Sequence, residues 1–112
     1  MNGEYWEPEI ETMPREALLR LQTEKLRRTV EISLRSPFYG RRLREAGITP
    51  DAIKTVDAIR KIPFTTKRDL RENYPLGLVG GERKTATRIY PSLGRTGHHR
   101  VWVYSSPDAA CW

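Results

Sequence analysis

The hydrophobic period of the sequence changes at the Gly80-Gly81 pair, and this change constrains the fold more than any other feature. Before the pair, apolar residues recur at intervals of four and seven, which is typical of a helix with one buried face. After it, two β-prone runs flank a polar loop, as in a β-hairpin. The sequence therefore predicts an α+β fold, with four or five helices up to about Asn73 and then a β-hairpin. The main helical stripe consists of Leu19, Leu26, Val30 and Leu34, widened by Leu18 and Leu21.

Local signals mark where the first two long helices begin and end. Pro14 opens the first helix, and Ser36-Pro37 combines a capping hydroxyl with a proline suited to the first helical position. This pair is expected to end the first helix and to start the second. Gly47 then provides a left-handed stop, so the two helices should form a helical hairpin.

Shorter helical turns are expected between Gly47 and the glycine pair. One begins at Pro50 and another follows Thr55, which is its predicted cap. Thr66 and Asp69 have the spacing of a capping box for a last helix, with Leu70 as its apolar anchor. We expect a single partial domain divided into an extended arm (1–12), a helical segment (13–73), a glycine-rich loop (74–84), a β-hairpin (85–104) and the start of a truncated helix (105–112).

The charge of the chain bears on its partners. Of the 112 residues, 38% are hydrophobic and 30% are charged, and the net charge is +6. Phosphate-bearing partners fit this balance. However, glutamates alternate with arginines along the first long helix, in the pairs Glu24/Arg28 and Glu31/Arg35, which favours a solvated face over a nucleic-acid interface. We therefore do not expect nucleic acid as a partner.

The cysteine and hydropathy patterns bear on the compartment. Cys111 is the single cysteine, so the chain forms no internal disulfide, which points to a reducing compartment. No apolar run reaches membrane-spanning length, and the first residues lack the pattern of a signal peptide. A cytoplasmic protein without membrane contact is expected.

The loop between the two β-prone runs has the composition of an anion site. Gly94 and Gly97 permit backbone angles that expose successive N–H groups, and the Ser92 and Thr96 hydroxyls add further donors. Phosphate is the natural ligand of such a loop. A polar hairpin that binds nothing remains the alternative, because short glycine motifs recur by chance.

Other chemistry finds little support in the sequence. No Gly-Lys-[Ser/Thr] follows the glycines, so the loop is not a nucleotide-binding P-loop of that type. His98 and His99 lack neighbouring carboxylates or thiols that would complete a zinc site. Ser92 and Cys111 lack the surroundings of a nucleophile. We therefore assign no catalytic residue and no metal ligand.

Four stretches together resemble the opening of phenylacetate–coenzyme A ligases, which belong to the adenylate-forming, AMP-binding superfamily. They are residues 9–15 (Glu-Ile-Glu-Thr-Met-Pro-Arg), 36–39 (Ser-Pro-Phe-Tyr), 62–67 (Ile-Pro-Phe-Thr-Thr-Lys) and 70–75 (Leu-Arg-Glu-Asn-Tyr-Pro). The resemblance implies a ligase of phenylacetate catabolism. Such an enzyme joins phenylacetate to coenzyme A and converts Mg-ATP into AMP and diphosphate, by way of an acyl adenylate.

The family's phosphate loop has the pattern Ser-Ser-Gly-Thr-Thr-Gly-Lys-Pro, and residues 92–99 match half of it. Ser92, Gly94, Thr96 and Gly97 agree with the pattern. The four departures are Leu93 for serine, Arg95 for threonine, His98 for lysine and His99 for proline. By resemblance, the phosphate-binding residues are Ser92, Gly94, Arg95, Thr96, Gly97 and His98.

The resemblance also implies that the chain is an incomplete part of a larger adenylate-forming fold. The family's nucleotide, magnesium, acyl and coenzyme A sites lie downstream, so we expect no catalysis and no bound cofactor from this chain alone. Three readings stay open: a truncated ligase relative, a non-enzymatic basic module that binds phosphate-rich polymers, and one piece of a split ligase completed by a second chain. Self-association through unpaired strand edges is also expected.

Overall fold

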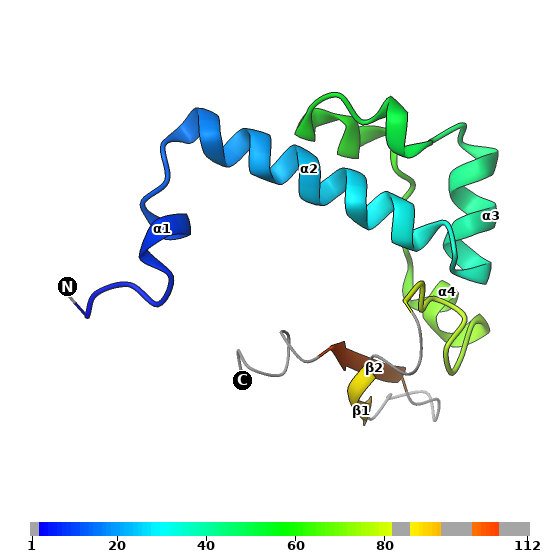
Figure 1. Ribbon diagram of the computed structural model, residues 1–112. Coiled ribbons are helices and arrows are strands. Elements are labelled where there is room, and N and C mark those ends of the chain that lie inside the picture. The colour runs from blue at the N-terminus through cyan, green and yellow to red at the C-terminus, as the bar shows by residue number, and fades with distance from the viewer. Residues whose placement is uncertain (1–2, 82–85, 93–99, 106–112) are drawn as a thin grey trace.

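The computed structural model describes residues 3–81, 86–92 and 100–105. Figure 1 shows a helical part above a small sheet, with α4 beside the sheet. The elements are α1 (Pro8–Glu11), α2 (Arg15–Ser33), α3 (Pro37–Glu45), the 3₁₀ helices η1 (Pro50–Ala52) and η2 (Val56–Lys61), α4 (Lys67–Glu72), and the strands β1 (Ala86–Ser92) and β2 (Arg100–Ser105).

Residues 1–12 were predicted to form an extended arm, and this prediction is wrong for Pro8–Glu11, which form the single helical turn α1. Pro8 occupies the first helical position, where its missing N–H costs nothing. The backbone N–H of Glu11 donates to the Glu7 carbonyl at 2.9 Å, and that of Thr12 donates to the Pro8 carbonyl at 3.0 Å. Glu9 adds a carboxylate at the positive end of the helix dipole. These local contacts favour a turn in a segment too short to show a hydrophobic period.

The helical hairpin forms as predicted and holds the core. Ser36 caps α3, its Oγ accepting from the Tyr39 backbone N–H at 3.2 Å, and Gly47 has the left-handed φ of 71°. Helix α2 begins one residue after Pro14 and ends at Ser33, earlier than expected. The ion pair seen on α2 also differs from the predicted ones, which join residues four positions apart. Arg28 Nη1 lies 3.3 Å from Glu31 Oε2, three positions away. The core cluster is Val30, Leu43, Ile48 and Ile53, with Leu26, Leu34, Tyr39, Ala58 and Ile62 packed against it.

The segment after Gly47 has the predicted short helices and the predicted capping box. Thr66 Oγ1 accepts from the Asp69 N–H, and the Asp69 carboxylate accepts from the Thr66 N–H. Two details are corrected. The Thr55 side chain forms no capping hydrogen bond at η2, and the buried residue of α4 is Asp69, whereas Leu70 is half-buried.

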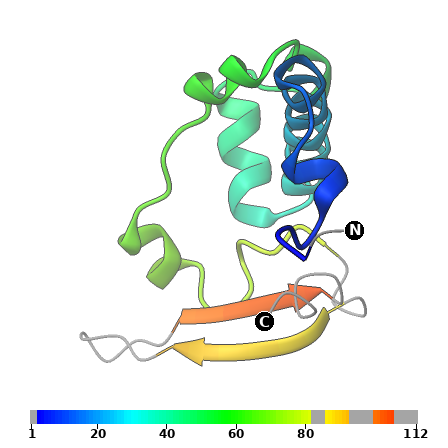
Figure 2. The ribbon, with the colours of Figure 1, turned by 90° about the vertical axis from the view of Figure 1, so that its left-hand side faces the viewer.

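Residues 74–81 follow α4 and are held against the α2–α3 junction. The Gly77 carbonyl accepts from Ser36 Oγ at 2.8 Å and from the Phe38 N–H at 3.2 Å. A Cβ at Gly80 would collide with the Ile32 carbonyl oxygen, so only glycine fits this approach. Figure 2 shows this segment passing between the helical part and the strands.

Strands β1 and β2 pair antiparallel. Arg88 lies opposite Tyr104, Tyr90 opposite Trp102, and Ser92 opposite Arg100, with an irregularity between Ala86 and Arg88. Most of the described chain is helical, as the sequence predicts. Residues 93–99, which would complete the predicted β-hairpin, lie outside the described residues, so the hairpin as a whole stays a prediction. The predicted truncated helix falls on Ser105, which belongs to β2, and on residues outside the described ranges.

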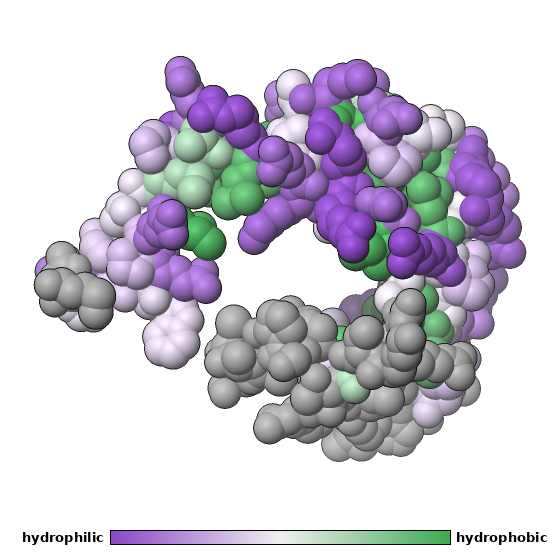
Figure 3. All heavy atoms as spheres, in the orientation of Figure 1, coloured by the Kyte–Doolittle hydropathy of each residue, from purple (hydrophilic) through white to green (hydrophobic). Residues whose placement is uncertain are grey.

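The face of the helical part seen in Figure 3 is largely hydrophilic. Figure 3 shows polar side chains gathered over α2 and α3, with apolar atoms visible between them. This arrangement agrees with a solvated helix face. Within the described ranges, no helix combines the length and the apolar character needed to cross a membrane.

Candidate functional site

The structure places the two ends of the predicted phosphate loop next to each other. Ser92 is the last residue of β1 and Arg100 is the first of β2, and the two are register partners. Directly opposed residues of an antiparallel pair have Cα atoms about 4.5–5.5 Å apart. Residues 93–99 therefore connect two adjacent strand ends. Of the six predicted site residues, the structure locates the backbone of Ser92, while Gly94, Arg95, Thr96, Gly97 and His98 lie outside the described residues.

The glycine-rich segment that follows α4 is tied to the helical part. Ser36 is 1% exposed, and its hydroxyl both caps α3 and donates to the Gly77 carbonyl. The Gly77 N–H donates to the Asn73 carbonyl at 2.8 Å, which links the connection to the end of α4. One buried serine thus joins α3 to the chain that enters β1.

A second set of polar contacts holds α4 against α3. Arg42 Nη1 lies 3.1 Å from Asp69 Oδ2, and Arg42 Nη2 lies 3.4 Å from Asp69 Oδ1. The backbone N–H of Thr66 is the largest cause of a lowered pKa at Asp69; burial opposes it, and the Thr66 hydroxyl and the Arg42 guanidinium lower the pKa further. The Arg42 guanidinium carbon also lies 4.5 Å from the centre of the Phe38 ring.

The lowered pKa of Asp69 predicts an acid-dependent loss of stability. As the pH falls, the unfolded state, with a carboxyl pKa near 3.8, binds its proton before the folded state does. The stabilisation is therefore present above that value and is lost as the pH falls through the lower folded-state pKa. We expect Asp69→Asn to be less stable than the wild type near neutral pH, with the difference shrinking below pH 3.8 in urea titrations. Asp57→Asn, at an exposed position of η2, is the control. If the difference in unfolding free energy between Asp69→Asn and the wild type did not depend on pH, this account would be contradicted.

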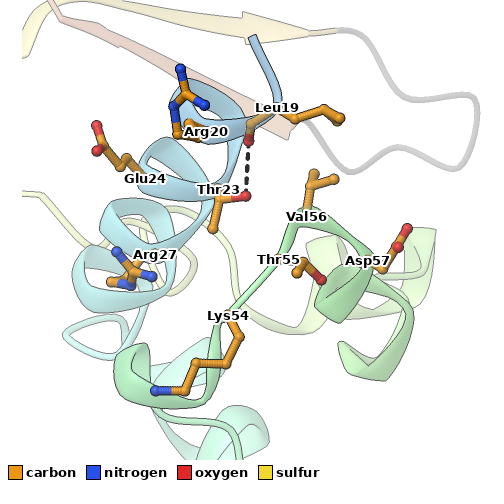
Figure 4. A pocket seen from close by; sticks show the side chains of 9 residues that line it. All are labelled: Leu19, Arg20, Thr23, Glu24, Arg27, Lys54, Thr55, Val56 and Asp57. Carbon is orange, nitrogen blue, oxygen red and sulfur yellow. Dashed lines mark hydrogen bonds between the residues drawn. The ribbon is translucent and has the colours of Figure 1, made fainter. Parts of the chain in front are cut away.

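Sequence analysis missed a groove between α2 and the segment of η1 and η2. Its volume is about 480 Å³, within the range of small-molecule pockets. Figure 4 shows α2 side chains on one side and residues 54–57 on the other. Arg27 Nη2 donates to the Ile53 carbonyl at 2.7 Å, which holds the two sides together. The lining residues are Leu19, Arg20, Thr23, Glu24, Arg27, Lys54, Thr55, Val56 and Asp57.

The groove has no chemistry that identifies a ligand. Arg20, Arg27 and Lys54 line it together with Glu24 and Asp57, so side chains of both charges are present. Leu19 and Val56 supply its apolar part. Within the ranges that the structure describes, no group of three or more His, Cys, Asp or Glu side chains could hold a metal ion. No local sequence signal predicts this groove, because it depends on how α2 packs against residues some thirty positions later.

Comparison with known proteins then identifies the family. The chain is 43% identical over 104 residues to a phenylacetate-coenzyme A ligase of Thermus thermophilus. Ligases of the same name from Escherichia coli and Pseudomonas putida are 36% and 35% identical over the same length. Each match covers 92% of this chain. The chain belongs to the phenylacetate–coenzyme A ligase family. No protein-family profile matches the sequence.

The matched region covers most of this chain but only a small share of each relative. It covers 23% of the Thermus thermophilus ligase and 24% of the Escherichia coli ligase. The chain thus spans about a quarter of the length of the phenylacetate-coenzyme A ligases that it matches. The family resemblance predicted from four short motifs is confirmed, and the comparisons extend it to 104 residues.

Proposed function

We propose that this chain is the part of a phenylacetate–coenzyme A ligase that carries the phosphate-binding loop. The carrying observation is the 43% identity to the Thermus thermophilus ligase across 92% of the chain. In the proposed reaction, phenylacetate attacks the α-phosphorus of ATP to give an acyl adenylate and diphosphate. The coenzyme A thiol then displaces AMP to give phenylacetyl-coenzyme A.

The proposed role of residues 92–99 is to hold the leaving diphosphate. Negative charge accumulates there as the bond to the α-phosphorus breaks, so fixed donors lower the barrier. The Ser92 and Thr96 hydroxyls and the amides at Gly94 and Gly97 are such donors, and Arg95 supplies positive charge. His98 completes the set. This donor set suits an anion, and the pairing of Ser92 with Arg100 supports the proposal because it brings the two ends of the loop together.

The remaining chemistry is assigned to the part of a ligase that this chain does not include. Magnesium would accompany ATP, and we assign neither a magnesium ligand nor a coenzyme A contact to the described residues. The proposal therefore includes a complementing part, in the same polypeptide or in a second chain. The 112-residue chain alone is proposed to be inactive.

A chimeric ligase tests the proposed function. The matched segment of the Thermus thermophilus ligase is replaced by the corresponding residues of this chain, and thioester formation is followed with ATP, phenylacetate and coenzyme A. We expect measurable ligase activity that depends on all three substrates. A folded chimera that forms no acyl adenylate, even with the Thermus thermophilus loop restored, would contradict the proposal.

The isolated chain is expected to show no ATP-dependent thermal shift. Phosphate contacts alone must offset the entropy lost when the nucleotide is immobilised, without adenine or ribose contacts to share that cost. A ligand at a hundred times its dissociation constant stabilises a fold by about 2.7 kcal/mol, which a melting experiment detects readily. The variant Leu93→Ser/Arg95→Thr/His98→Lys/His99→Pro should also show no shift. A clear shift in the unaltered chain would refute this prediction.

A further inference from the structure

Phe64 stands out among the exposed large hydrophobic residues that the structure describes, because it is 91% exposed. It lies between η2 and α4, two residues after Ile62, which packs against the core. Full burial of a phenylalanine is worth roughly 1.5–3 kcal/mol relative to exposure. A phenylalanine this exposed contributes little to the stability of the described chain.

The backbone around Phe64 is held in place although its side chain is not. Arg42 Nη1 donates to the Phe64 carbonyl at 2.9 Å. The Thr65 hydroxyl lies 2.7 Å from the Tyr39 hydroxyl, and the Thr66 N–H donates to Asp69 Oδ2 at 2.8 Å. Three consecutive residues are thus tied to α3 or α4.

The side chains that hold this backbone are themselves packed. Phe38 is 3% exposed, supports the Arg42 guanidinium, and meets the Tyr39 ring edge-on at 4.9 Å between ring centres. Asp69 is 9% exposed and accepts from Arg42 as well as from Thr66. The backbone that carries Phe64 is therefore held in a fixed position by packed side chains. Aromatic residues presented in this way lose little conformational entropy on binding and are typical interface anchors.

The charge around Phe64 indicates what surface it meets. Arg60, Lys61 and Lys67 flank it in the sequence, and all three are exposed. An apolar residue among cations fits an apolar socket with acidic groups at its rim. The relatives supply the candidate for that surface, because about three quarters of the Thermus thermophilus ligase lies outside the match.

We propose that Phe64 inserts into an apolar socket, rimmed by carboxylates, on the remaining three quarters of the ligase. This contact locks the helical segment onto the rest of the enzyme. The inference rests on the proposed function only in taking the chain to be one part of a ligase. It concerns burial and not catalysis, so the two can fail separately.

Thiol alkylation tests the contact without any substrate. Phe64→Cys is made on a Cys111→Ser background, in the isolated chain and in the chimera, and its reaction with N-ethylmaleimide is followed by peptide mass spectrometry. We expect the reaction to be on the order of tenfold slower or more in the chimera, because the reagent then reaches the thiol only after local opening. Trp6→Cys, at an aromatic position that is 81% exposed and outside this network, is the matched control and should react at similar rates in both proteins.

A second measurement separates an anchor from a residue that merely supports the fold. Phe64→Ala should leave the melting temperature of the isolated chain unchanged and should lower that of the chimera. If the chimera is insoluble, both measurements are made in the Thermus thermophilus ligase at the aligned position.

Several results would overturn the proposal. The first is that Phe64→Cys is alkylated at the same rate in the isolated chain and in the chimera. The second is that Trp6→Cys and Phe64→Cys are equally protected in the chimera. The third is that Phe64→Ala lowers the melting temperature of the isolated chain. Protection in the isolated chain that grows with protein concentration would indicate a second copy instead. Protection by phosphatidylglycerol vesicles would indicate a membrane instead. An inactive chimera with a protected thiol would count against the proposed function alone.

Discussion

Placing residues 92–99 into the Thermus thermophilus ligase, in exchange for its own phosphate loop, should lower turnover by about a hundredfold or more, the scale of losing one donor to developing charge. Leu93 offers no hydroxyl where the family pattern has serine, and His98 places an imidazole where the pattern has the ammonium group of lysine. Both changes reduce the stabilisation of the departing diphosphate. Diphosphate release under saturating substrates measures the effect.

The matched control restores the two donors within the graft. Leu93→Ser with His98→Lys should recover most of the lost turnover, whereas His99→Pro, which adds no donor, should recover little. Wild-type turnover in the unaltered graft would show that Ser92, Gly94, Thr96 and Gly97 suffice for the role of the loop.

Replacing Leu43 by alanine should produce a large loss of stability in the helical part. Leu43 is 2% exposed and packs in the cluster with Val30, Ile48 and Ile53. Removing a buried leucine side chain costs about 2–5 kcal/mol, since the lost transfer free energy adds to that of the cavity left behind. Small domains have unfolding free energies of only about 5–15 kcal/mol in total. Urea denaturation followed by circular dichroism measures the loss.

Leu70→Ala is the control for the same chemical change at a less buried place. Leu70 is half-buried on α4, so the substitution should lower the urea midpoint by clearly less than Leu43→Ala does. Equal losses at the two positions would show that the core centred on Leu43 does not dominate the stability of the chain.

The candidate site could be predicted from the sequence in its composition but not in its placement. The glycines and hydroxyls of residues 92–97 are readable as phosphate donors, because donor chemistry belongs to individual residues. The pairing of Ser92 with Arg100, by contrast, depends on strand register, and the irregularity after Ala86 has no sequence signature that we recognised. The groove beside α2 and the exposed Phe64 also depend on packing and were not predicted.

The sequence by itself determined several features whose contacts span four residues or fewer, although it missed the turn α1 and wrongly predicted a Thr55 cap. The Ser36 cap, the left-handed Gly47 and the Thr66–Asp69 capping box all appear where the sequence predicts them, since each depends on its own turn of backbone.

Only the tertiary structure decided the contacts between distant segments. Ser36 meets Gly77, 41 residues away, and Arg42 meets Asp69, 27 residues away. Asp69 has two roles as a result: its capping bond was readable, but its burial was not, so Leu70 was wrongly predicted as the anchor of α4. The physical reason is that burial depends on which surfaces meet, and distant surfaces are brought together by the packing of the whole core rather than by any local residue preference.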